Sequence, residues 1–369
     1  MKILHVVFSL EPGGMENGLV NVARGLDARE FQIHVCCLEQ RGRFAERLPQ
    51  PENVSVLAKC SGFSTRTALA LRREIARIRP DLIHSHNLGP LIYSGLATCF
   101  GFACPILQGE HAELPPEEQS LRRVLQRRVL YRTCHKVHTV SHALRDQLVM
   151  LGFSKEKIAV IVNGVDTLRF MPGYRAAARQ GIGLPVDALV LGIVGRFGQF
   201  KRHMLLVEVF EQIAPRFPNA HLLVVGGGGP EEQHIEARAR QSAAAGRIHF
   251  AGFQNDTRPY YQAMNLLVAP SVNEGLSNAV LEAMACGVPV LANRACGSTE
   301  AIDNGINGYI ADLDSVENLR EYLRLALSDP LHLTELGASA RRKMTTSFSI
   351  DQMVAGYEQI YRQIADKLH

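Results

Sequence analysis

Short apolar segments alternate with helical segments along almost the whole chain, and this alternation limits the possible folds more than any other feature. The first apolar segment, 2–10, is followed by Pro12, Gly13 and Gly14 and then by apolar residues at helical spacing. A continuous apolar strand is typical of a parallel sheet that is covered on both faces. The same order starts again at Ala188. We therefore predict an α/β protein with two doubly wound, Rossmann-like domains.

Turn residues and changes of period divide the 369-residue chain into four segments. Residues 1–165 and 188–345 are the two predicted domains, as expected at about 150 residues per domain. Residues 166–187 are rich in glycine and proline, and we predict a linker there. Residues 346–369 have helical spacing, which predicts a helix that packs back on the first domain. Ligands of open α/β sheets bind beyond the carboxyl ends of the strands, so the loops at those ends are the candidate site.

The composition is that of a globular protein, but the charge is uneven. Hydrophobic residues make up 46% and charged residues 21%, which excludes a disordered or collagen-like chain. The net charge of +4 is too small to indicate nucleic-acid binding over the whole surface. Residues 1–165 contain 21 basic and 15 acidic residues, whereas the remainder contains 19 and 21. The first domain is therefore the candidate for contact with an anionic partner.

Cysteine usage and hydropathy favour a cytoplasmic protein. The eight cysteines include no C-x-x-C pair, and several lie in apolar surroundings, as expected of buried thiols. Met1 leads directly into an apolar strand, without the regions of a signal peptide. Residues 88–107 are uncharged, but glycine, proline and serine interrupt them. We predict a short helix and a buried strand there, not a membrane span.

The segment 272–289 combines two carboxylates with the start of a helix. Glu274 follows a predicted strand, Asn278 is the predicted N-cap, and Glu282 lies about one turn inside the helix. Backbone N–H groups at such a helix start are expected to be free and to attract an anion. The residues that carry them are Gly275, Leu276, Ser277 and Asn278. Carboxylates beside an anion site suit a phosphate that is bonded to hydroxyl-rich groups.

Several separated motifs resemble those of retaining glycosyltransferases of family 4, which have the GT-B fold. The two glutamates are followed by Ala-Met-Ala-Cys-Gly-Val-Pro, which resembles the family signature. Other stretches that resemble family blocks are Pro12-Gly-Gly-Met-Glu16, Asp81-Leu-Ile-His-Ser-His86, Gly109-Glu-His111, Val140-Ser141, Asn163-Gly-Val-Asp166 and Gly195-Arg-Phe-Gly-Gln-Phe-Lys201. The resemblance covers nearly the whole chain. It implies two Rossmann-like domains that face a central cleft.

The resemblance also implies roles for five residues. Arg196 and Lys201 are implied to grip the diphosphate of a nucleotide-sugar donor, and His111 to line the sugar pocket from the first domain. Glu274 is implied to hold sugar hydroxyls and Glu282 ribose hydroxyls. Since the family reacts on one face of the sugar, with the leaving phosphate taking the acceptor proton, we assign Glu274 to orientation and electrostatics. The family is typically metal-independent, so we expect no metal and no other cofactor.

Glycines and one aromatic residue are further candidates for substrate contact. Gly13 and Gly14 allow a close backbone approach. Alone they indicate a tight turn, and the family context shifts them towards donor or acceptor contact. Phe253 either contacts the base or packs in the core. The run 226–229 lacks the Lys-Ser/Thr of a phosphate loop, and we interpret it as making room for the nucleotide.

Histidines and a basic segment allow two readings each. His135, His138 and His142 lack the usual zinc spacing, so we expect no metal there. His84 and His86 are interpreted as structural or cleft-lining. The segment 121–136 contains six basic residues. It is either a solvated surface or a docking face for anionic lipid headgroups that presents a lipid-linked acceptor.

The combined prediction is a cytoplasmic hexosyltransferase, with peripheral attachment to the inner face of the membrane as one option. The resemblance implies a UDP- or GDP-sugar donor and a glycan or lipid-linked acceptor in bacterial exopolysaccharide or lipid-linked glycan assembly. Two alternatives share the fold: a nucleotide-sugar epimerase and a non-catalytic sugar-nucleotide-binding protein. A nicotinamide dehydrogenase is disfavoured because neither domain has a G-x-G-x-x-G turn.

Overall fold

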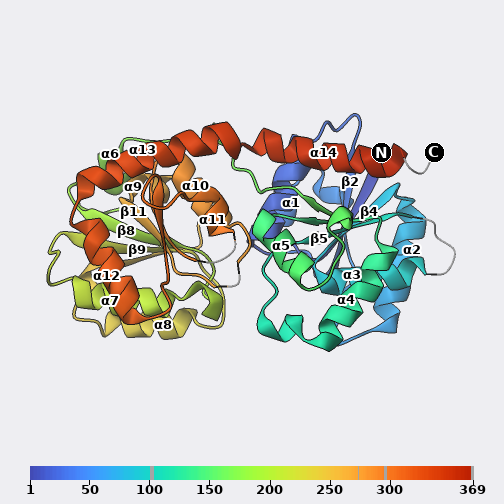
Figure 1. Cartoon of the computed structure of the whole chain (residues 1–369), viewed down its shortest axis with the longest axis horizontal. Coiled ribbons are helices and arrows are strands. Elements are labelled where there is room, and N and C mark those ends of the chain that lie inside the picture. The colour runs from blue at the N-terminus through green and yellow to red at the C-terminus, as the bar shows by residue number, and fades with distance from the viewer. Residues whose placement is uncertain (100–103, 273, 295–296, 367–369) are drawn as a thin grey trace. The chain divides into compact units, whose positions relative to one another are not determined.

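The computed structural model describes residues 1–99, 104–272, 274–294 and 297–366, which form two compact units. The first unit contains Met1–Asn163 and the chain from Ile350 onwards, and the second contains Gly164–Ser349. Figure 1 shows that each unit is a sheet with helices packed around it. The chain therefore leaves the first unit once and returns to it with its last helix.

The first unit is built on a seven-stranded sheet with the order β3-β2-β1-β4-β5-β6-β7, and its neighbouring strands are parallel. The strands are β1 (Lys2–Ser9), β2 (Gln32–Gln40), β3 (Val54–Val56), β4 (Leu82–His86), β5 (Ile106–Glu110), β6 (Lys136–Thr139) and β7 (Ile158–Val160). In β1, Leu4 is in register with His34 of β2 and Ile83 of β4. The strand order reverses at β1 and β4, where parallel sheets bind ligands.

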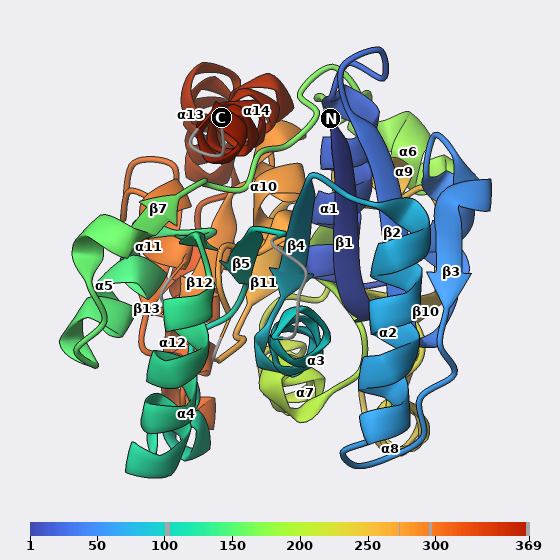
Figure 2. The same ribbon diagram turned by 90° about the vertical axis from the view of Figure 1, so that its right-hand side faces the viewer.

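Helices cover both faces of this sheet. They are α1 (Gly14–Gly25), α2 (Thr65–Ile78), α3 (Leu88–Thr98), α4 (Leu121–Thr133), α5 (His142–Met150) and α14 (Ile350–Asp366), with short 3-10 turns at Arg43–Arg47, Pro51–Asn53, Pro116–Gln119 and Lys155–Lys157. Ile3 shares a core with Val22 of α1 and Tyr361 of α14. Leu4 shares the opposite core with Leu71 of α2, because successive strand residues face opposite sides. Figure 2 shows α2, α3 and α4 on that side.

The second unit is built on a six-stranded sheet with the order β10-β9-β8-β11-β12-β13, again with parallel neighbours. The strands are β8 (Leu189–Val194), β9 (Ala220–Val225), β10 (Ile248–Gly252), β11 (Leu266–Ala269), β12 (Val290–Asn293) and β13 (Gly308–Ala311). Its helices are α6 (Arg175–Gly181), α7 (His203–Ile213), α8 (Glu232–Arg240), α9 (Arg258–Ala263), α10 (Asn278–Ala285), α11 (Ser298–Ala301), α12 (Val316–Leu327) and α13 (Pro330–Ser347), with 3-10 turns at Gln199–Lys201 and Ala245–Arg247. The prediction of two Rossmann-like α/β units is confirmed.

The prediction of a linker over 166–187 is wrong. This segment belongs to the second unit and contains α6. Arg179 of α6 is buried, and its guanidinium donates to the carbonyl oxygens of Ala263 and Val186 and to Asn265 Oδ1 at 2.5–3.0 Å. These bonds fix the segment to the sheet, which its glycine and proline content did not reveal.

Two helices, not one, occupy the C-terminal region. The predicted helix over 346–369 is interrupted, because α13 ends at Ser347 and α14 begins at Ile350. At the interruption, Val165 N–H donates to Phe348 O at 2.9 Å. α14 packs on α1 so closely that a Cβ on Gly25 would lie 2.4 Å from Val354 Cγ2.

No helix in the described ranges is long and apolar enough to cross a bilayer. The uncharged stretch 88–107 forms α3 and the start of β5, as predicted, with residues 100–103 outside the described part.

Candidate functional site

Lys201 and Glu274, 73 positions apart in sequence, form an ion pair in the second unit. Lys201 ends the 3-10 turn after β8, and Glu274 lies in the loop between β11 and α10. Lys201 Nζ contacts Glu274 Oε1, and the two side chains are 25% and 23% exposed. A pair that remains this accessible can exchange its partner for a ligand. The structure therefore brings together two of the predicted catalytic residues.

Arg196 lies in the same loop as Lys201, and its side chain is exposed. The glycine run 226–229 holds this loop in place. Gly195 N–H donates to Val225 O, and Phe197 N–H to Gly228 O, both at 2.9 Å. A Cβ on Gly229, which has a φ of +117°, would lie 1.9 Å from Phe197 O. The run thus supports the backbone that carries Arg196.

The start of α10 differs in detail from the prediction. Ser277, not Asn278, is the N-cap, and its hydroxyl makes no capping hydrogen bond. Leu276 and Asn278 each make a further interaction, and the row of free N–H groups stays a prediction. Gly275 and Leu276 are buried, and Gly297 packs against their backbone so closely that a Cβ would lie 2.3 Å from Gly275 O. The helix start is a fixed backbone beside Glu274.

Glu282 lies on α10 and is half-buried. The hydroxyl of Tyr261 on α9 donates to Glu282 Oε2 at 2.9 Å. Burial raises the pKa of Tyr261 well above its usual value, and the Glu282 charge adds to this, so the phenol stays protonated and acts as a donor. Sequence reasoning missed Tyr261, because no motif links it to Glu282.

Phe253 follows β10, and its side chain is half-buried at the edge of the core. Its backbone nitrogen and Cβ pack against Gly227, where a Cβ would lie 3.0–3.1 Å away. Phe253 therefore borders the same glycine run that supports the Arg196 loop. Its contact with a base stays a prediction.

An Asp-x-Asp sequence, the kind of motif that can hold a divalent ion, is present at Asp312-Leu313-Asp314. Asp314 Oδ1 is ion-paired with Arg202, and Asn293 donates to the same oxygen at 3.3 Å. Asp312 Oδ1 accepts from Asp314 N–H at 3.1 Å. These contacts give both carboxylates structural partners within the second unit.

In the first unit, His111 and Gly14 line one cavity together with Asn163. The other residues around it are His5, Met15, Gly18, Leu19, Val22, His84, His86, Tyr357 and Tyr361. Gly14 is the first residue of α1 and Gly13 its N-cap. A Cβ on Gly13 would lie 2.2 Å from Glu16 Oε2, so the glycine leaves room for that carboxylate. The structure brings together Gly14 and His111, and Gly13 directly precedes Gly14 in the chain.

Five histidines form two hydrogen-bonded chains. One lies on β1, two on β4, one directly after β5 and one on β6. His86 Nδ1 lies 2.9 Å from His111 Nε2, and His86 Nε2 lies 2.9 Å from His5 Nδ1. In the second chain, His84 bonds to His138 Nε2 at 2.8 Å and to the Tyr361 hydroxyl at 2.9 Å. The reading of His84 and His86 as cleft-lining is thus refined to members of a buried network.

Burial keeps these imidazoles neutral at pH 7. It lowers the pKa of His5 to about 3, with a further contribution from His111, and that of His111 to about 4. The pKa values of His84 and His86 are also well below the usual value, from burial and from the neighbouring imidazoles. By distance, His5, His84 and His86 offer three nitrogen ligands within 4.8 Å of one another. In the structure these side chains are bonded to each other and to their neighbours.

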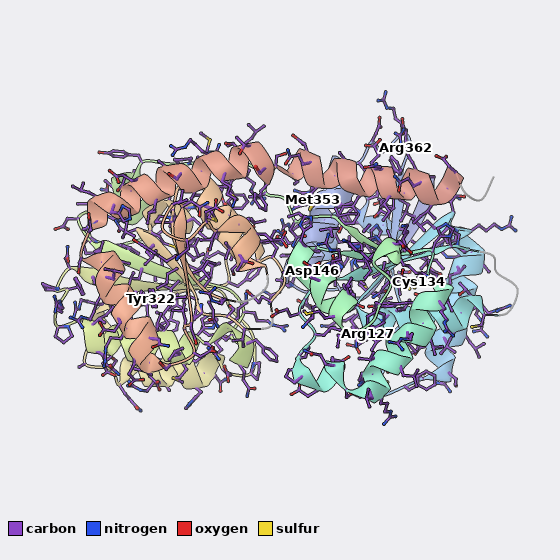
Figure 3. All side chains as sticks on the ribbon, viewed as in Figure 1. Arg127, Cys134, Asp146, Tyr322, Met353 and Arg362 are labelled. Atoms are coloured by element: carbon purple, nitrogen blue, oxygen red, sulfur yellow. The ribbon has the colours of Figure 1, made fainter. Side chains whose placement is uncertain are left out.

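Arg127, a member of the predicted basic segment, lies on α4 (Figure 3) and is buried. Its Nη1 donates to Glu118 Oε2 at 2.7 Å, and its Nε lies 3.8 Å from Glu110 Oε1. Glu110 also accepts from the Tyr131 hydroxyl at 2.6 Å. The interpretation of 121–136 as a solvated basic surface is therefore wrong at Arg127, which anchors α4 to β5.

Comparisons with known proteins agree with this architecture. Residues 12–169 match the family described as Glycosyltransferase Family 4, and residues 175–343 match Glycosyl transferases group 1. A solved structure of Anabaena Alr3699/HepE with UDP and glucose has a TM-score of 0.85 at 23% identity and covers 99% of each chain. A sucrose-phosphate synthase of Thermosynechococcus elongatus has a TM-score of 0.80 at 22% identity, over 98% of each chain.

Two parallel Rossmann-like units give this chain the architecture of the GT-B fold, which the solved structures share. The chain belongs to glycosyltransferase family 4. It is 28% identical to a D-inositol 3-phosphate glycosyltransferase of Kribbella flavida, over 86% of this chain and 73% of that protein. It is 30% identical to the lipopolysaccharide core biosynthesis glycosyltransferase LpsE of Rhizobium meliloti, over 57% of this chain and 59% of that protein.

Proposed function

We propose that the protein is a retaining, metal-independent hexosyltransferase that uses a UDP- or GDP-sugar and a glycan or lipid-linked acceptor in polysaccharide biosynthesis. The observation that supports this best is the accessible Lys201–Glu274 pair beside the start of α10. In support, Alr3699/HepE has been solved with UDP-glucose, and LpsE acts in lipopolysaccharide core biosynthesis.

In this proposal, Arg196 and Lys201 bind the donor diphosphate. Negative charge grows on the leaving phosphate as the glycosidic bond breaks, and the two cations stabilise it without a metal. Glu274 holds Lys201 before the donor binds and then orients sugar hydroxyls. Glu282, held by Tyr261, accepts hydrogen bonds from the ribose. The leaving phosphate takes the acceptor proton, and the sugar keeps its anomeric configuration.

Matched substitutions test the diphosphate and sugar roles. We expect Lys201→Ala and Glu274→Ala to lower the turnover of UDP-glucose or GDP-mannose by about 10²–10³-fold. Lys343 and Glu211 are ion-paired residues of the same unit with 22% and 25% exposure, close to the values of Lys201 and Glu274. Lys343→Ala and Glu211→Ala are the controls and should leave turnover unchanged. Normal turnover in Lys201→Ala or Glu274→Ala would contradict the proposal.

The reaction products separate the alternatives. A transferase consumes donor in step with an added glycan or lipid extract, whereas an epimerase converts the donor alone. A non-catalytic binding protein shows a thermal shift with UDP-glucose but no consumption, because a ligand bound by the folded state raises its stability. Anomeric analysis of the product by NMR decides whether the configuration is retained, and activity in EDTA decides whether a metal is needed.

A second observation favours membrane attachment through α4. Three apolar side chains at a spacing of four form an exposed row: Leu121 (90% exposed), Leu125 (60%) and Val129 (56%). Exposed arginines flank this row at Arg122, Arg123, Arg128 and Arg132. An apolar row between cations suits a surface of anionic lipid headgroups. We propose that the first unit docks there on the inner face of the cytoplasmic membrane.

Vesicle binding tests the docking of α4. Arg122→Ala with Arg132→Ala should weaken co-sedimentation with anionic phosphatidylglycerol vesicles, most strongly at low salt. The control is Arg66→Ala with Arg73→Ala, which removes the same charge from exposed positions of the same unit. Equal loss in both double variants would leave only a nonspecific effect of net charge and would contradict docking through α4.

A further inference from the structure

His86 is fully buried, and both of its ring nitrogens are bonded to other imidazoles. Its chain runs from His111 Nε2 through His86 to His5 Nδ1. His111 Nδ1 has no partner among the described residues and is not among the enclosed orphaned atoms. His5 Nε2, at the other end, is enclosed and has no hydrogen-bond partner among the residues described. The chain therefore has one open end, at His111.

The two bonds restrict the protons on this chain. A neutral imidazole carries one proton, so it donates through one nitrogen and accepts through the other. If the protons ran from His111 towards His5, an N–H on His5 Nε2 would be buried without an acceptor. If the protons run from His5 towards His111, His5 Nε2 carries only an unused lone pair. Buried N–H groups without a partner are the rarer case. The second direction is therefore favoured.

We propose that His86 is a positioning residue, which donates from Nδ1 to His111 Nε2 and so fixes His111 as the tautomer with its proton on Nδ1. The open nitrogen of His111 then presents a neutral N–H donor, which suits a hydroxyl oxygen of the sugar. This last step rests on the proposed function, whereas the tautomer does not.

The backbone beside the chain supports a fixed position for His111. A Cβ on Gly109 would lie 2.7 Å from His111 Nε2 and 2.6 Å from His138 Nε2. Glycine at this position leaves the space in which the two imidazoles pack against the backbone of β5. Both rings are therefore held from the strand side as well as by their hydrogen bonds.

Nitrogen NMR tests the tautomer without any assay of activity. Full-length protein labelled with ¹⁵N-histidine is measured at pH 7, and His111→Gln identifies the His111 signals. We expect a protonated Nδ1 and an unprotonated Nε2. Protonation on Nε2, or an equal mixture of tautomers, would overturn the proposal. Stoichiometric zinc or copper in the purified protein, measured by mass spectrometry, would also overturn it, because the nitrogens would then be metal ligands.

A matched set of variants tests positioning against simple structural support. His86→Asn places an amide N–H near the position of Nδ1, whereas His86→Gln removes the donor to His111. His84→Gln is the control, because His84 lies on the same strand, is equally buried and has no bond to His111. We expect His86→Gln to lower kcat/KM for UDP-glucose by about 10–100-fold at similar thermal stability to His84→Gln, with His86→Asn recovering most of the loss.

The two arms separate the possible failures. Equal losses in His86→Gln and His84→Gln, or no recovery in His86→Asn, would overturn positioning even in an active enzyme. If the wild-type protein turns over no nucleotide sugar, the proposed function fails, and the NMR result still decides the tautomer.

Discussion

Each unit places an acid at or just after the end of a strand and beside a cation, but the two pairs differ in exposure. In the first unit, Glu110 and Arg127 have side chains 3% and 4% exposed. In the second, Lys201 and Glu274 are 25% and 23% exposed. Glu110 is also bonded to Tyr131 and Gln108, so its acceptor capacity serves the fold. Burial therefore identifies the pair that holds the fold, whereas partial exposure leaves the Lys201–Glu274 pair accessible to a ligand.

The sharpest way to break this comparison is to remove the buried cation. We expect Arg127→Ala to lower the free energy of unfolding by about 3–5 kcal/mol, because Glu110 is left charged and buried without its cation. Arg128→Ala, at the next and exposed position of α4, should stay within about 0.5 kcal/mol of wild type. Urea unfolding followed by circular dichroism measures both. Similar values for the two variants would show that the Arg127 pair does not stabilise the first unit.

The exposed pair should behave in the opposite way. Lys201→Met and Glu274→Gln should each change the free energy of unfolding by at most about 1 kcal/mol, because exposed ion pairs contribute little. Each should lower turnover strongly. In the double variant, we expect a turnover no higher than that of the less active single variant, because the two residues bind the same donor. Recovery of turnover in the double variant would mean that each residue only neutralises the other.

The sequence predicted the sheets better than it predicted the contacts around them. Continuous apolar segments such as 2–10 indicate buried parallel strands from the local sequence alone. Both sheets could therefore be predicted from such segments. The linker prediction for 166–187 fails because α6 is short and because its anchor, Arg179, contacts residues about 84 positions away. Likewise, nothing in the local pattern of 121–136 distinguishes Arg127 from its exposed neighbours. His5 and His86 are 81 positions apart and meet only because β1 and β4 are neighbours in the sheet.

The buried histidines of the first unit predict a smaller, pH-dependent difference in stability between the two units. His5 and His111 have folded-state pKa values of about 3 and 4, below the value of about 6.5 in an unfolded chain. Below pH 6.5 the unfolded chain therefore binds more protons than the folded chain, and stability falls as the pH falls. Each such histidine contributes up to about 1.4 kcal/mol per pH unit in this window and nothing above it.

Hydrogen exchange at pH 7 and pH 5 localises this effect to one unit. The first unit contains five bonded, buried or half-buried histidines. The second contains buried His203, with a pKa of about 4, and a half-buried bonded pair, His221 on β9 and His249 on β10, whose pKa values burial also lowers. After correction for the intrinsic exchange rate, peptides from β4 should lose more protection than peptides from β11, a strand of the second unit without histidine. His84→Gln removes one titrating group and should reduce the pH dependence at β4 but not at β11. Equal loss of protection in the two sheets would show that the buried imidazoles do not control the acid stability of the first unit.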